Sequence, residues 1–140
     1  MNTRKQEAMN QIAAMEVGNL SYLRRITIRD ALNAHTARQA GYEPEITTGG
    51  YLLVAPRGGI KNDHVHPSET AAWEASPDFL NSVDACLTLP LPPDIELVLY
   101  PSWGVEIHVT GGYLSGGVQA VEGKPLSVAM LKAWWLVQSD

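Results

Sequence analysis

Cysteine and long apolar runs are scarce in this sequence, and each shortage excludes a class of protein. Cys86 is the only cysteine, so the chain forms no internal disulfide and no cysteine-based zinc cluster. It lies in an apolar segment without a basic neighbour to stabilise a thiolate, so we expect a buried, unreactive thiol. The apolar stretch 127–137 is interrupted by Lys132 and is far too short for a bilayer span. We therefore expect no membrane helix.

An apolar signal core is also missing, because the first seven residues are followed by further polar residues. A cytoplasmic location is the resulting expectation. What is present fits one folded domain: the chain has 140 residues, of which 45% are hydrophobic and 18% are charged.

Charge is unevenly distributed along the chain. The first forty residues carry six basic and three acidic side chains, whereas the remaining hundred carry four basic and twelve acidic ones. Neutralising a phosphate backbone requires clustered Lys and Arg, so this balance argues against duplex nucleic-acid binding by the main domain. It is compatible with a soluble acidic domain that meets a basic partner.

Two helices are expected in the first forty residues. Residues 3–17 are rich in helix-forming residues and end before Gly18, and we interpret residues 1–26 as an N-terminal helical arm. Thr27 followed by Asp30 resembles a helix start, and Gly41 is a typical stop, which predicts a helix over 28–40. Residues 27–140 are then a single domain.

From residue 45 onward the spacing of apolar residues changes from a helical period to one typical of strands, which predicts strands. Residues 45–48 and 51–55 flank Gly49-Gly50, a hairpin signal. Residues 95–100 and 103–110 are the clearest strands, joined across Pro101-Ser102, and the second alternates apolar with polar residues. Residues 118–122 are expected to add an edge strand. The fold class is therefore α+β, with helices packed on a small antiparallel sheet of three to five strands.

Three further helical segments are expected in the second half of the chain. Residues 70–75 are read as a turn or short helix, and a capped start at 81–84 predicts a helix to about Leu89. Pro125 suits the first position of a closing helix whose apolar residues recur at helical spacing. That helix is expected to cover the sheet.

The order of these features resembles a known family. Residues 34–42, 77–89 and the proline-started segment 123–133 are similar to the phage αβα-sandwich domain, to which NinX-like phage proteins are distantly similar. The resemblance covers residues 28–138. It implies helices on both faces of a small sheet and an accessory gene of a phage or prophage, without an established activity, cofactor or catalytic residue.

Candidate binding residues lie in three places. Arg24, Arg25 and Arg29 form the only basic cluster and are suited to a phosphate-bearing ligand or an acidic surface. Tyr113 lies in a glycine-rich loop that lacks the Lys-Ser/Thr of a P-loop. Trp134 and Trp135 point about 100° apart on a helix, so we expect Trp135 to reach an interface, or else to lie over Leu131.

Catalytic motifs are not recognisable. His64 and His66, with Asp63 beside them and His108 as a distant partner, offer an incomplete set of metal ligands. Neither Ser102 nor Ser115 lies in a nucleophile elbow. We therefore expect no metal and no cofactor.

The leading hypothesis is a non-enzymatic phage or prophage accessory protein that binds a host component, either a macromolecule or a small ligand. One version of it is an inhibitor of a bacterial defence system, such as an anti-CRISPR. One alternative is an oligomeric sponge for a nucleotide signal that uses the arginines and Tyr113. A second is a small metal-dependent hydrolase that uses His64, His66 and Asp63. A third is a structural or assembly role that depends on the N-terminal arm and Trp135. A homo-oligomer remains an expected possibility.

Overall fold

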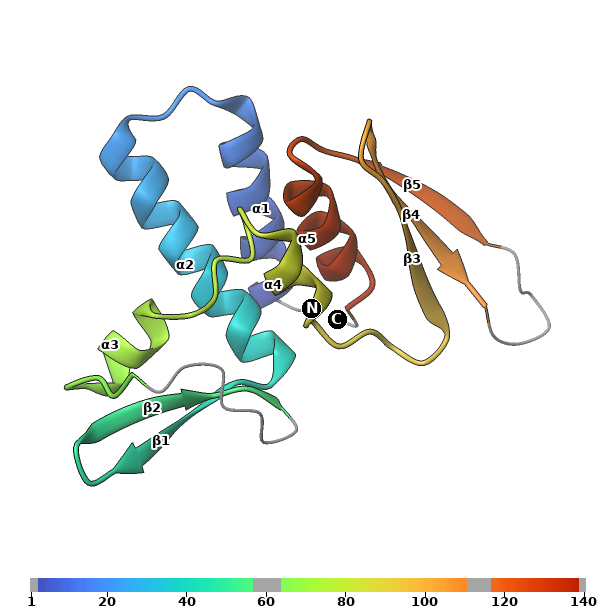
Figure 1. Ribbon diagram of the computed structural model, residues 1–140. Coiled ribbons are helices and arrows are strands. Elements are labelled where there is room, and N and C mark those ends of the chain that lie inside the picture. Colours follow the sequence, from blue (N-terminus) through green and yellow to red (C-terminus); the bar gives the residue numbers. More distant parts are fainter. Residues whose placement is uncertain (1–2, 57–63, 111–116, 139–140) are drawn as a thin grey trace.

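The chain forms five helices and five strands in the part that the computed structural model describes, residues 3–56, 64–110 and 117–138 (Figure 1). The α+β class is confirmed. The elements run in the order α1 (Thr3–Val17), α2 (Tyr22–Ala40), β1 (Glu43–Thr47), β2 (Gly50–Val54), α3 (Glu69–Glu74), α4 (Val83–Leu87), β3 (Ile95–Tyr100), β4 (Gly104–Val109), β5 (Val118–Glu122) and α5 (Leu126–Leu136).

The strands divide into two antiparallel sheets, β1-β2 and β3-β4-β5. In Figure 1 these sheets lie on opposite sides of the group formed by α1, α2 and α5. The expected first hairpin is present, but Thr47 pairs with Gly50, so the two turn residues are Thr48 and Gly49 rather than Gly49 and Gly50. Gly50 is required in the strand because its φ is +142° and a β-carbon there would overlap the His66 carbonyl.

The three-stranded sheet follows the alternation seen in the sequence. Val105 and Ile107 of β4 are buried, whereas Glu106 and His108, which alternate with them, are partly exposed. Tyr100 pairs with Gly104, so the β3–β4 turn has three residues and includes Trp103, which stacks on Tyr100 with ring centroids 5.0 Å apart. The expected edge strand is β5, which pairs with β4.

Helix α5 lies between the other helices and the three-stranded sheet, and this position accounts for its two tryptophans (Figure 1). Trp134 is 2% exposed and donates from Nε1 to the Pro90 carbonyl (2.8 Å). Trp135 is fully buried and donates from Nε1 to the Thr36 hydroxyl (3.0 Å). The expectation that Trp135 reaches an interface is therefore wrong: the sandwiched helix buries both indoles within one chain.

Helix α1 is present as expected, but it packs into the core instead of extending as an arm. Ala8 and Ile12 are fully buried. The Lys5 ammonium donates to the carbonyls of Leu136 (3.1 Å) and Gln138 (2.8 Å), which ties α1 to the end of α5. These contacts join α1 to the same core as the rest of the chain.

Helix α2 begins at Tyr22, six residues before the expected start. The Ser21 hydroxyl accepts a hydrogen bond from the Arg24 N–H (3.3 Å) and so caps the helix. Thr27, the expected cap, instead donates its hydroxyl to the Leu23 carbonyl from within the helix. The boundary between residues 26 and 27 therefore falls inside α2. Gly41 ends the helix in the left-handed conformation, as expected.

The short helices α3 and α4 both begin with a serine cap. Ser68 accepts a hydrogen bond from the Ala71 N–H and Ser82 accepts one from the Ala85 N–H, each at 3.1 Å. None of the helices in the described part of the chain is long and apolar enough to cross a membrane.

Candidate functional site

A pocket of about 360 Å³ opens between the first hairpin and helices α3 and α4. Its volume lies within the range of small-ligand sites, and most of its wall is apolar. We call it the hairpin pocket. It is lined by Tyr42, Leu53, His64, His66, Ala75, Pro77, Asp84, Ala85 and Thr88.

Tyr42 forms a rigid part of the hairpin pocket. The turn at Gly41 places the Tyr42 N–H on the Ala37 carbonyl (2.9 Å), and the Tyr42 ring meets Phe79 edge to face at 6.1 Å. Burial raises the pKa of the Tyr42 phenol, and a hydrogen bond with Thr88 opposes that shift. This side chain is therefore a neutral, fixed surface at physiological pH.

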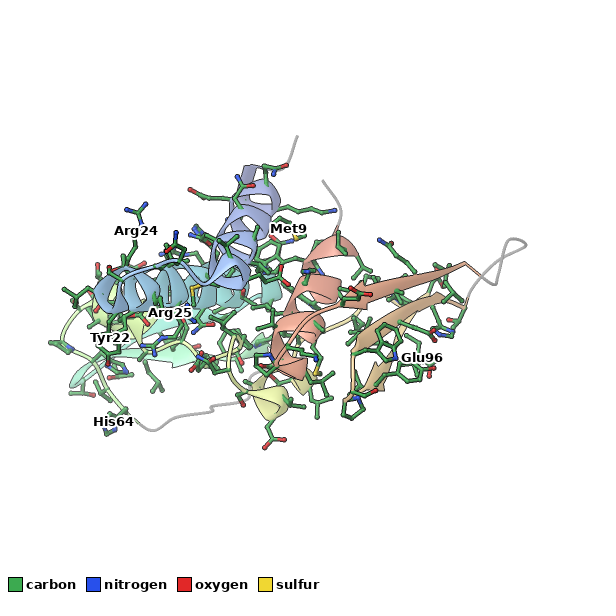
Figure 2. The ribbon with its side chains drawn as sticks, turned by 90° about the horizontal axis from the view of Figure 1, so that it is seen from above. Met9, Tyr22, Arg24, Arg25, His64 and Glu96 are labelled. Carbon is green, nitrogen blue, oxygen red and sulfur yellow. The ribbon has the colours of Figure 1, made fainter. Side chains whose placement is uncertain are left out.

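The two histidines form one rim. His66 exchanges two backbone hydrogen bonds with Tyr51 (2.8 and 2.7 Å), so this short segment pairs with the free edge of β2. The rings of His64 and His66 lie edge to face, with centroids 6.1 Å apart. His64 is exposed and extends outward at this end of the molecule (Figure 2).

The opposite wall comes from α4. Asp84, Ala85 and Thr88 line the pocket, and Ser82 fixes the first turn of the helix that carries them. The pocket thus combines an apolar body with imidazoles on one side and a carboxylate on the other. Such an arrangement orients an apolar group that carries polar substituents.

A second, smaller hollow lies against α4, so the helix forms a ridge between two hollows. This leucine hollow measures about 110 Å³ and is lined by Cys86, Leu87, Leu89, Leu91, Leu97, Leu99, Met130 and Trp134. Leu87 is 62% exposed and Leu91 is 38% exposed. Cys86 is buried as expected: burial raises the pKa of its thiol to about 12, and the thiol donates to the Phe79 carbonyl.

The histidines do not belong to a metal site in the described part of the chain. No group of three or more His, Cys, Asp and Glu side chains there is arranged to hold a metal ion. Asp63 lies outside the described residues. His108, the expected distant ligand, lies on β4 in the other sheet and its Nε2 bonds Glu106 Oε1 (3.0 Å).

The arginine cluster is divided by the early start of α2. Arg25 and Arg29 line a hollow of about 210 Å³ together with Met15, Tyr22, Ile26 and Asn81, which we call the arginine hollow. Arg24 does not line it and extends from the other side of α2 (Figure 2). Tyr113 lies outside the described residues.

No protein-family model matches the sequence, and no curated protein or solved structure is significantly similar to it. The class that the structure defines is an α+β protein with two hollows around α4. Its function is therefore argued from those surfaces.

Sequence reasoning missed most of the hairpin pocket. Tyr42, Leu53 and Thr88 carry no motif and come from three different elements or loops. Two local signals were present. One was the pair His64 and His66, which the sequence presented as an incomplete set of metal ligands, and the other was the four-residue spacing of Asp84 and Thr88, which places them on one side of a helix.

Proposed function

We propose that this protein acts by binding a partner protein, whose side chains enter the hollows on both sides of α4. The observation that carries this proposal is the exposed ridge of α4 between the hairpin pocket and the leucine hollow. Binding energy at protein interfaces concentrates on a few apolar anchors that fill such pockets.

The exposure of Leu87 favours a protein partner over a small molecule. A leucine that remains 62% exposed on the ridge gains free energy only when a surface covers it. A small molecule in the hairpin pocket leaves that side chain in water, and one in the leucine hollow meets only the part of Leu87 that lines it. A partner that spans the ridge covers Leu87 and Leu91 and fills both hollows together.

The chemistry of the lining supports binding in preference to catalysis. The described lining of the hairpin pocket contains no serine or cysteine beside its imidazoles. Cys86 lines the other hollow, but its thiol donates to the Phe79 carbonyl and burial raises its pKa to about 12, which suppresses the thiolate that a nucleophile requires.

The test is affinity purification of the tagged protein from a bacterial lysate, with Leu87→Glu as the variant and Leu23→Glu as the matched control. Leu23 is 76% exposed on α2, away from both hollows, so the same charge is introduced without touching α4. We expect a stoichiometric protein with the wild type and the control, and its loss with Leu87→Glu. Equal recovery with all three proteins would contradict the proposal.

The kind of partner is proposed from the resemblance of residues 28–138 to phage αβα-sandwich proteins. It supports a phage or prophage accessory protein that acts in the host cytoplasm on a defence component, as an anti-CRISPR does. The net charge of −5 favours a partner with a basic surface, such as a nucleic-acid-binding groove. Expression in a host with active CRISPR defence is expected to restore plaque formation by a targeted phage, and unchanged immunity would refute this assignment.

A further inference from the structure

The arginine hollow is formed by the first two turns of α2, the end of α1 and Asn81. Arg25 and Arg29 lie one helical turn apart and line the same hollow, with Tyr22 beside them. The remaining walls include the apolar side chains of Met15 and Ile26. The arginine hollow, of about 210 Å³, therefore combines two guanidinium groups with an apolar and aromatic surface.

The charge at this site is unfavourable for the helix that carries it. The N-terminus of a helix is its positive end, which favours acidic side chains in the first turn. The first turn of α2 has no acid, and it carries Arg24 and Arg25 instead. An anion bound in the arginine hollow relieves this repulsion, so the arrangement points to a negatively charged ligand.

Arg25 and Arg29 differ in how their guanidinium groups are held, and both states suit an anion. Arg29 donates from Nε and Nη2 to Asp30 Oδ1, both at 3.1 Å, which fixes its guanidinium and leaves Nη1 outside that pair. The Arg25 side chain is exposed and has no carboxylate within 4 Å among the residues that the structure describes. One positioned guanidinium and one unpaired guanidinium suit a phosphate group, which accepts several charge-assisted hydrogen bonds.

Tyr22 supplies the second half of a binding site. It is 76% exposed, three residues before Arg25, so its ring borders the same hollow without being packed in the core. Planar bases stack on exposed aromatic rings, and the stacking contributes about 1–3 kcal/mol per base. The small volume accommodates phosphate and one face of a ring, and the acidic body of the chain disfavours a long polyanion.

We propose that the arginine hollow binds a nucleoside phosphate, with the phosphates on Arg25 and Arg29 and the base on Tyr22. This site is separate from the α4 ridge, so either proposal stands or falls without the other.

Calorimetric titration at low ionic strength tests the assignment with adenosine 5′-diphosphate, pyrophosphate and adenosine as probes. We expect the diphosphate to bind, pyrophosphate to bind at least about fivefold more weakly, and adenosine not to bind detectably. Equal affinity for pyrophosphate and the nucleotide would overturn the base contact. An absence of nucleotide binding would overturn the site.

Matched substitutions locate the contact. Arg25→Gln and Arg29→Gln are each expected to lower nucleotide affinity about tenfold, whereas Arg24→Gln, outside the hollow, changes it less than about threefold. Tyr22→Leu is expected to weaken nucleotide binding and leave pyrophosphate binding unchanged. Equal losses for all three arginine variants would indicate a diffuse charge effect and refute the site.

Titration with a glutamate-rich peptide distinguishes a nucleotide ligand from an acidic protein surface. We expect it to bind at least about tenfold more weakly than the nucleotide, because it offers carboxylates without a base to stack on Tyr22. Equal or tighter binding that depends on Arg25 would replace the nucleotide by an acidic protein partner.

Discussion

The two sheets of this protein differ in how much of them is buried. The three-stranded sheet places Val105, Ile107 and Val121 against α5, which itself has eight buried residues. In the first hairpin, both strands of which are fully described, Leu53 is the only buried residue, and Ile46 is 81% exposed. We call the three-stranded sheet with α5 the sheet side, and the first hairpin with α3 the hairpin side. The sheet side supplies most of the packed core, whereas the hairpin side supplies the wall of a pocket.

This difference shows how a small chain separates stability from binding. A pocket requires side chains that do not collapse onto one another, so the elements around it contribute less apolar burial. The segment between α3 and α4, which borders the pocket, is held to α2 by polar contacts. Asn33 is central to them: it donates to Asp78 Oδ1 (2.9 Å) and accepts from the Leu80 N–H (3.2 Å).

The largest effect is expected from Trp135→Ala, which removes a fully buried side chain between α5 and α2. The cavity and the lost contacts should lower the free energy of unfolding by about 3–5 kcal/mol in urea denaturation. Trp73→Ala is the control, because Trp73 is partly exposed on the hairpin side beneath Arg38 (4.6 Å). Equal losses for the two variants would contradict the comparison between the two sides.

Asn33→Ala is expected to lower the free energy of unfolding by about 1–3 kcal/mol, because it leaves the buried Leu80 N–H without an acceptor. Hydrogen exchange should accelerate around residues 78–82 and remain slow in β4. Asn81→Ala is the control, because that amide also donates to Asp78 but does not serve the Leu80 N–H. Faster amide exchange in β4 alone would contradict this prediction, because it would place the stabilising effect of Asn33 in the three-stranded sheet.

Ser82→Ala is expected to destabilise α4 by about 1 kcal/mol, because it removes the cap of the pocket's helical wall. Ser82→Thr, which retains a hydroxyl, should preserve most of the stability. The measurement is amide exchange in α4. If both variants exchange at the wild-type rate, the cap does not hold this wall.

The smallest effect concerns acid stability on the sheet side. Hydrogen bonds from His108 and Tyr100 lower the pKa of Glu106 from its ordinary value of 4.5. Its ionised form therefore stabilises the fold above that value, and the contribution is lost as the pH falls through the lower pKa. Glu106→Gln should show a smaller decrease in Tm between pH 6 and pH 3 than the wild type, and Glu96→Gln is the exposed control. An unchanged decrease would exclude this role.

The sequence predicted the features that depend only on neighbouring residues, such as the buried face of a strand and the ends of helices. The alternation of Val105 and Ile107 identified the buried face of β4, Gly41 marked a helix end, and the run 81–84 marked a helix start. These signals depend on neighbours within a few residues. The start of α2 was misplaced at Thr27, because its hydroxyl and Asp30 resemble a cap, whereas Ser21 caps the helix in the structure.

The candidate sites could not be predicted to the same extent. The hairpin pocket joins Tyr42, Leu53 and Thr88 through tertiary contacts that no spacing reveals. The arginine cluster was visible, but its division depends on where α2 begins, because Arg24 points away from Arg25 only once both are helical. Trp135 was assigned to an interface because the sequence does not show that α5 is covered on both sides.

The two adjacent indoles of α5 also make the fluorescence of this protein sensitive to the two faces of that helix. Trp134 is anchored to the Pro90 carbonyl and lines the leucine hollow, whereas Trp135 is anchored to Thr36 of α2. In a chain that retains Trp134 alone, with the other three tryptophans replaced by phenylalanine, the fluorescence therefore reports on the packing of α5 near the three-stranded sheet. The complementary chain with Trp135 alone reports on the packing of α5 against α2, so fluorescence can follow the order in which the two faces of α5 are exposed.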